Sequence, residues 1–248
     1  MIIIQGLLLS LTAGLATGIG GLLSIFIKPE HRRIIAIILG IVAGMMLAVS
    51  FISLIVESIE NSGITLTSIG FTLGMVILLI VDSIIPHVHI TLKCEGISEE
   101  KIMKGLVIAI GISLHNIPEG LAVASSYIVK PSLGIIVALV IGIHNIPEGL
   151  ITAIPLREAG VNIMRILLLT LFSGLSEPLA ALITLLILRE VSLEILSLAS
   201  SFAAGAMLYI VIDELIPEAY THKENAHPFI IGNIIGVIIA LLIINTLG

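Results

Sequence analysis

Long apolar stretches separated by short polar segments recur along the whole chain. Each stretch is about 20 residues long, the length that an α-helix needs to cross the hydrocarbon core of a bilayer. Transmembrane strands would instead give alternating segments of about ten residues. The pattern therefore predicts an all-α membrane protein whose residues 1–248 form one domain of eight transmembrane helices, at about residues 3–26, 35–57, 64–85, 104–127, 132–155, 166–188, 195–217 and 228–247.

The composition agrees with this class. Apolar residues make up 58% of the 248 residues and charged residues only 11%, and the mean hydropathy is +1.24. A water-soluble domain carries about 25% charged residues, so this chain has too little polar surface to cover itself in water. The single cysteine, Cys94, excludes a disulfide framework or a thiolate metal cluster within one chain.

The basic residues indicate the orientation in the membrane. Nine of the eleven lie after the first, third, fifth and seventh predicted helices, whereas only Lys130 and Arg189 lie on the opposite side. Segments rich in Lys and Arg stay in the cytoplasm. We therefore expect a multi-pass protein of the inner (plasma) membrane, with both chain ends outside the cytoplasm and the long segment 86–103 inside it.

The sequence also repeats itself. Residues 115–121 (HNIPEGL) recur identically at 144–150, and residues 43–57 match 204–218 at seven of fifteen positions. A weaker match joins the first and sixth helices. The first three helices then correspond to the last three and the fourth to the fifth, and each helix runs opposite to its mate. This arrangement predicts an inverted 3+2+3 repeat, a type of fold that places the substrate site near the midplane where the repeats meet.

The repeated HNIPEGL segments carry chemistry that is unusual for membrane helices. In each copy the histidine and the glutamate are four residues apart and share one helix face, which the asparagine borders. The proline removes one backbone N–H and leaves a carbonyl available to a cavity. The sixth helix adds a further glutamate beside a proline. Together these helices offer His115, Asn116, Glu119, His144, Asn145, Glu148 and Glu177.

The charge of this cluster indicates its ligand. A carboxylate at membrane depth costs at least about 2.5 kcal/mol, so three carboxylates require cations or protons. One or two divalent cations bring the trio close to neutrality, which an anion or a neutral solute would not. Imidazole and carboxylate suit Zn²⁺, with Fe²⁺, Mn²⁺ and Cd²⁺ also compatible, and the lack of sulfur ligands in the cluster argues against Cu⁺. The alternative is that these side chains only form hydrogen bonds between helices.

Two H-N-x-P-E-G signatures in consecutive helices, followed by S-x-x-S-E-P at 173–178, resemble the Zrt/Irt-like (ZIP) metal transporters, and most closely their bacterial ZupT-type branch. The resemblance implies the ZIP fold, a homodimer and a binuclear metal centre. It implies that one ion is held by His115, Glu119, His144 and Glu148. It implies that the second ion is held by Asn116, Glu119, Asn145, Glu148 and Glu177.

Two further groups of polar residues lie toward the membrane surfaces. The resemblance implies a metal-exit station on the cytoplasmic side, and the alternative there is a set of solvated helix ends; the residues concerned are Asp82, His87, His89, Asp213 and Glu214. On the outer side, Ser50 and Glu57 lie seven residues apart on one face of the second helix. They are candidates for a metal entrance.

These features predict an uptake transporter that moves divalent transition-metal ions, zinc above all, into the cytoplasm by alternating access. We expect no prosthetic group and no nucleic-acid partner. Two alternatives remain at this level. An intramembrane metal-dependent hydrolase would need a motif such as H-E-x-x-H, which the sequence lacks. A passive metal-selective channel would use the same ligands as a carrier and differ only in gating.

Overall fold

The computed structural model describes residues 2–27, 31–84, 98–158, 160–221 and 225–247, with side chains for all of these except 84, 98–112 and 158. Regular structure in the described residues is entirely helical, which confirms the all-α prediction. The elements are α1 (Ile2–Leu23), η1 (Ser24–Phe26), α2 (Arg32–Ala48), η2 (Val49–Leu54), α3 (Ile55–Ile84), α4 (Ser98–Val129), α5 (Pro131–Glu158), α6 (Ile163–Gly174), α7 (Ser176–Leu188), α8 (Leu193–Ile210), η3 (Val211–Leu215), α9 (Ile216–Tyr220) and α10 (Ala226–Leu247).

Much of the helical structure is long and apolar enough to cross a membrane. Among the described residues this holds for six stretches: Ile2–Phe26, Arg32–Ser83, Pro131–Arg157, Ile163–Leu188, Leu193–Tyr220 and Ala226–Leu247. Large apolar side chains cover their outer faces; Phe172 and Ile187, for example, are 67% and 65% exposed. Such apolar faces suit contact with lipid, and the helical backbone beneath them satisfies its own hydrogen bonds. The protein is therefore a multi-pass membrane protein.

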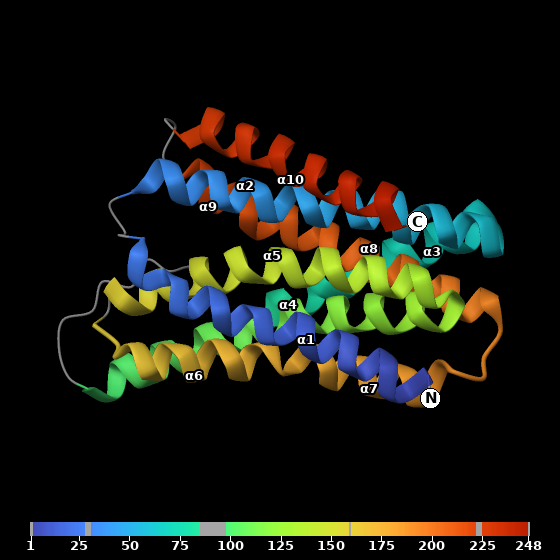
Figure 1. Cartoon of the computed structure of the whole chain (residues 1–248), viewed down its shortest axis with the longest axis horizontal. Coiled ribbons are helices and arrows are strands. Elements are labelled where there is room, and N and C mark those ends of the chain that lie inside the picture. The colour runs from blue at the N-terminus through green and yellow to red at the C-terminus, as the bar shows by residue number, and fades with distance from the viewer. Residues whose placement is uncertain (1, 28–30, 85–97, 159, 222–224, 248) are drawn as a thin grey trace.

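The helices form two bundles that lie side by side (Figure 1). In the first bundle, α1 packs on α5 and α4 packs on α7; in the second, α2 packs on α10 and α3 packs on α8. Contacts of α4 with α8 and of α5 with α2 join the bundles. One cluster of buried apolar side chains has members in both bundles and includes Ala43, Met46, Ala204 and Met207. Both chain ends lie at the same end of the molecule (Figure 1).

The first bundle is held together by close backbone approaches at glycine. A Cβ at Gly14 would collide with the carbonyl of Gly174, and a Cβ at Gly174 would collide with the carbonyl of Gly14. The same relation joins Gly120 to the carbonyl of Glu177, and Gly149 to the carbonyl of Thr17. Only glycine permits these approaches, and they bring α1, α6 and α7 against the two helices that carry the repeated segments.

The sixth predicted helix, 166–188, is not continuous. It divides into α6, which ends at Gly174, and α7, which begins at Ser176. Pro178 has no N–H to donate to the carbonyl of Gly174, and the Ser176 hydroxyl donates to the carbonyl of Ser173 over 2.5 Å. The break therefore follows from the S-G-L-S-E-P segment, which the apolar pattern alone does not register.

The second and seventh predicted helices, 35–57 and 195–217, each contain a π-helical segment, η2 and η3. A π segment adds a residue to a turn and rotates the faces that follow it. The second helix also continues beyond its predicted end, because non-helical backbone first appears at Gly63 (φ 77°, ψ 166°). Asn61 accordingly lies within helical structure and not in a loop.

Candidate metal centre

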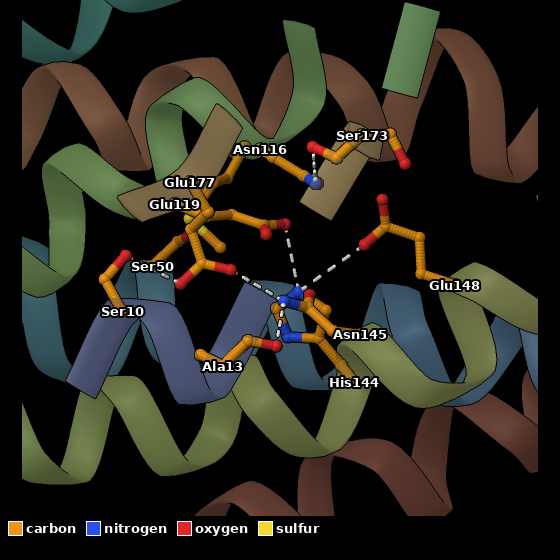
Figure 2. A network of polar contacts seen from close by, with 11 residues as sticks. Ser10, Ala13, Ser50, Asn116, Glu119, His144, Asn145, Glu148, Ser173 and Glu177 are labelled. Carbon is orange, nitrogen blue, oxygen red and sulfur yellow. Dashed lines mark hydrogen bonds and ion pairs between the residues drawn. The ribbon is translucent and has the colours of Figure 1, made fainter. Parts of the chain in front are cut away.

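The two repeated segments bring a histidine and two glutamates together inside the first bundle. Nε2 of His144 on α5 lies 3.0 Å from Oε1 of Glu119 on α4 and 4.0 Å from Oε2 of Glu148 on α5. One ligand atom from each side chain lies within 4.8 Å of the others. Figure 2 shows both carboxylates pointing toward the His144 ring. Nitrogen and carboxylate oxygen at this spacing can bind one divalent cation.

Burial makes the negative charge of this group energetically costly. The side chains of Glu119 and His144 are fully buried, and that of Glu148 is 15% exposed. A buried carboxylate without a compensating charge is costly. Lys and Arg residues with described side chains lie near helix ends or in loops, and protons or a bound cation can supply the compensating charge.

A second glutamate-containing group lies next to the first. Nδ2 of Asn145 donates to Oε2 of Glu177 over 2.8 Å and to the backbone carbonyl of Ala13 over 3.0 Å. The hydroxyl of Ser10 donates to the other carboxylate oxygen of Glu177 over 3.1 Å. Figure 2 shows Glu177 between Ser10 and Asn145. Three elements, α1, α5 and α7, thus hold this carboxylate in place.

Asn116, the counterpart of Asn145 in the first repeated segment, makes the matching contact. Its Nδ2 donates to the backbone carbonyl of Ser173 over 3.0 Å, at the break between α6 and α7. Only the amide nitrogen can face a carbonyl, so these contacts fix the orientation of both asparagines. In each case the side-chain oxygen is turned away from the contacting helix.

The side-chain oxygens of both asparagines, and one carboxylate oxygen of Glu119, lack a hydrogen-bond partner among the described residues. Within the part of the chain that the structure describes, Oδ1 of Asn116, Oδ1 of Asn145 and Oε2 of Glu119 are buried and accept no hydrogen bond. A buried polar atom without a partner typically costs about 1–3 kcal/mol. Lone pairs held without protein donors are what a hard or borderline cation requires of its ligands.

His115, the histidine of the first repeated segment, contacts a carboxylate of the second bundle. Its Nε2 is 2.7 Å from Oε1 of Glu214 on η3, in the second bundle. The sequence places Glu214 in a separate exit station, but the structure joins it to the histidine of the first repeated segment. Glu214 thus has a side-chain partner in the other bundle, while its carboxylate is still 41% exposed.

Of the other residues expected at the exit, Asp82 and Asp213 lie in the part of the chain that the structure describes. The phenol of Tyr209 on α8 donates to Oδ2 of Asp82 on α3 over 2.6 Å. Asp213 precedes Glu214 on η3, where it is half-buried. His87 and His89 lie outside the described residues.

The entrance candidates lie on the second helix, in and beyond η2. The hydroxyl of Ser50 contacts Sδ of Met207 on α8 at 3.7 Å; Figure 2 labels Ser50 in the same view as the centre. Glu57 is nearly buried and accepts a hydrogen bond from Asn61 over 2.9 Å. Both side chains face protein and not lipid, which an entrance requires.

The predicted ligands did not include two polar residues of α1 that lie next to the centre, Ser10 and Thr17. A pattern in the first helix could have indicated both of them. Ser10, Gly14 and Thr17 follow a spacing of four and then three residues, which places them on one helix face. A face made of small and polar residues in a membrane helix points to a close helix contact or to a polar site.

Comparison with known proteins identifies relatives of the whole chain. A family model described as ZIP zinc transporter matches residues 91–244. Three curated relatives, each named zinc transporter ZupT, match nearly their full length. The protein of Chlorobium chlorochromatii is 36% identical over 254 residues, covering 95% of this chain and 94% of the relative. That of Clostridium perfringens is 34% identical over 268 residues (96% and 94%), and that of Corynebacterium glutamicum 38% over 247 residues (92% and 94%).

Proposed function

This chain belongs to the ZIP zinc transporter family, and from that premise we propose that it carries Zn²⁺ across the membrane into the cytoplasm through two adjacent metal sites between α4, α5 and α7. Membership confirms the family resemblance. The observation that carries the proposal is the buried group of Glu119, His144 and Glu148, whose ligand atoms lie within 4.8 Å of one another. Fe²⁺, Mn²⁺ and Cd²⁺ are the other ions that such nitrogen and oxygen ligands accept.

The first ion binds to Glu119, His144 and Glu148, and His115 joins them after leaving Glu214. Four ligands of nitrogen and carboxylate oxygen match the preferred coordination of zinc. The contact of 4.0 Å between His144 and Glu148 leaves space for an ion to draw these side chains together. The contact between His115 and Glu214 supports a cycle in which this histidine alternates between the ion and the carboxylate.

The second ion binds to oxygen atoms only. Its ligands are Oδ1 of Asn116 and of Asn145, together with the carboxylates of Glu119, Glu148 and Glu177. The absence of protein partners for both amide oxygens in the described residues supports this assignment. Glu119 and Glu148 bridge the two ions, since each is one helical turn from a histidine and three residues from an asparagine.

An inverted repeat of eight transmembrane helices underlies the two sites. The stretch Arg32–Ser83 is 52 residues long, enough for two crossings, and non-helical backbone at Gly63 divides it. Two spans from this stretch, one from each of the five other stretches, and α4 together give eight spans. The reciprocal contact of Gly14 with Gly174 supports a pseudo-twofold axis that passes between α1 and α6. The π segments η2 and η3, at matching positions of the repeat, support it as well.

Transport follows from this symmetry as alternating access, in which the first bundle moves against the second. Ser50 and Glu57 line the entrance. Asp82, Asp213 and Glu214, with His87 and His89, receive the metal on the cytoplasmic side. We place both chain ends outside the cytoplasm of the inner membrane on the basis of the Lys and Arg distribution. A single domain of residues 1–248 and assembly as a homodimer complete the proposal, the latter by family resemblance.

Membership in a transporter family excludes the hydrolase alternative. The channel alternative is tested by flux. Purified protein in liposomes containing a zinc-sensitive dye should take up Zn²⁺ at a rate that saturates with external zinc, because a carrier turns over once for each conformational cycle. Uptake that rises linearly over the same range would indicate a channel. Uptake no faster than in protein-free liposomes would contradict zinc transport.

A further inference from the structure

Thr17 on α1 is a polar residue that none of the assignments above employs. Its side chain is fully buried, and among the described residues its hydroxyl oxygen has no hydrogen-bond partner. A buried threonine in a membrane helix normally donates to a carbonyl of its own helix. Thr67 and Thr184 do so, over 2.9 Å and 2.8 Å. The hydroxyl of Thr17 makes no such hydrogen bond within the described residues.

Thr17 packs against glycines that neighbour the centre. Its backbone carbonyl packs against Gly149, the residue directly after Glu148. On its other side, a Cβ at Gly174 would lie 3.3 Å from Cβ of Thr17. Gly174 directly follows Ser173, whose carbonyl accepts the hydrogen bond from Asn116. Thr17 thus lies between the residues next to Glu148 and the contact made by Asn116.

The repeat shows which role this position has. Asn145 donates to the carbonyl of Ala13, and Asn116 donates to the carbonyl of Ser173. Ala13 and Ser173 are 160 residues apart, as are Thr17 and Glu177. Likewise Gly149 packs on the carbonyl of Thr17, and Gly120 packs on the carbonyl of Glu177. Thr17 therefore occupies, relative to Asn116 and Glu148, the place that Glu177 occupies relative to Asn145 and Glu119.

We propose that Thr17 belongs to the second metal site, where its hydroxyl oxygen binds the ion beside Oδ1 of Asn116. This inference rests on the proposed function, because it adds a ligand to a site proposed there. One oxygen each from Thr17, Asn116, Asn145, Glu119, Glu148 and Glu177 forms the all-oxygen octahedral shell that hard divalent cations take. Threonine in place of a fourth carboxylate adds a ligand without adding charge, so two divalent ions remain nearly balanced by three glutamates.

The test is metal binding by three purified variants in detergent. Thr17→Val keeps the shape and removes the hydroxyl, Thr17→Ser keeps the hydroxyl, and Thr184→Val is the control, a buried threonine bonded to its own helix. Zn²⁺ titration by calorimetry, with metal counting after desalting, should give two ions for the unaltered protein, for Thr17→Ser and for Thr184→Val. Thr17→Val should bind the weaker ion at least about tenfold less tightly, the scale of losing a group that supports a metal site, and keep the stronger one.

Two outcomes would overturn the inference: equal affinities for both ions in Thr17→Val and the unaltered protein, or an equal loss in Thr17→Ser and Thr17→Val. Failure of the proposed function looks different, because the unaltered protein itself would then bind fewer than two ions. A melting curve identifies a variant that does not fold. In that case Thr17→Ala, which fits inside the space of threonine, replaces Thr17→Val in the same comparison.

Discussion

His115 on α4 and Glu214 on η3 meet across the two bundles, with Nε2 and Oε1 2.7 Å apart. The histidine is 17% exposed and the carboxylate 41%, so the contact lies at the edge of the buried region. If His115 is a ligand of the first ion, Glu214 competes with the metal for it. The same contact joins the bundles in this conformation, so the proposed mechanism would couple zinc binding to bundle movement through this imidazole.

Glu214→Gln should therefore strengthen zinc binding at the first site. Partly exposed pairs of this kind are worth about 0–1 kcal/mol, so the gain should be at most about fivefold. Uptake into liposomes should slow, because the ion loses a group that draws His115 away during release. Glu218→Gln, an exposed position one turn further on, is the control. Weaker binding by Glu214→Gln would instead make Glu214 a direct ligand in the first site.

The three buried glutamates should differ in their effects. Glu119→Gln and Glu148→Gln each remove charge from both proposed sites, and each should abolish zinc uptake. Glu177→Gln alters the second site alone and should leave one ion per chain with slower, saturable uptake. Metal counting and liposome uptake on the same preparations check this, with the exposed Glu194→Gln as control. Two ions retained by Glu177→Gln, or normal uptake by Glu119→Gln, would contradict the binuclear centre.

Acid should weaken metal binding. Protons compete with the ion for imidazole and carboxylate groups, and the first site consists only of these. Zinc affinity should therefore fall as the pH is lowered from about 7 to about 5, and Mg²⁺ should bind far more weakly than Zn²⁺ because it avoids nitrogen ligands. Calorimetric titration at both pH values tests the first point, and competition with Mg²⁺ tests the second. Tighter binding in acid, or equal affinity for the two metals, would count against the assignment.

The packing of α1 on α6 gives a prediction about stability. A methyl group at Gly14 would collide with the carbonyl of Gly174, and overpacking of this kind costs about 1–3 kcal/mol. Gly14→Ala should therefore lower the melting temperature of the purified protein. Gly142→Ala on α5 is the control, since its Cβ would lie no closer than 3.4 Å to Ala13. Equal melting temperatures for both variants would show that α1 and α6 are not in close contact at Gly14.

Sequence alone determined the class of the protein and the residue types of its centre. An apolar stretch of about 20 residues can satisfy its backbone in lipid only as a helix, so the all-α membrane fold follows from the pattern. The histidines, asparagines and glutamates of the repeated segments stood out because such groups are costly in a membrane. Their spacing along one helix placed them on a shared face without knowledge of any partner helix.

Tertiary structure decided which of these residues meet, and how. The contact of His115 with Glu214 depends on helices distant in sequence. The positions of Ser10 and Thr17 depend on such helices as well. In the hydrophobicity pattern these two residues are only isolated polar positions within an apolar helix. Backbone approach at Gly14 and Gly174 draws α1 onto α6, which lets the Ser10 hydroxyl reach Glu177 and buries Thr17 nearby. A local sequence pattern can indicate which residues share a helix face. Which atoms that face contacts depends on how closely separate helices pack.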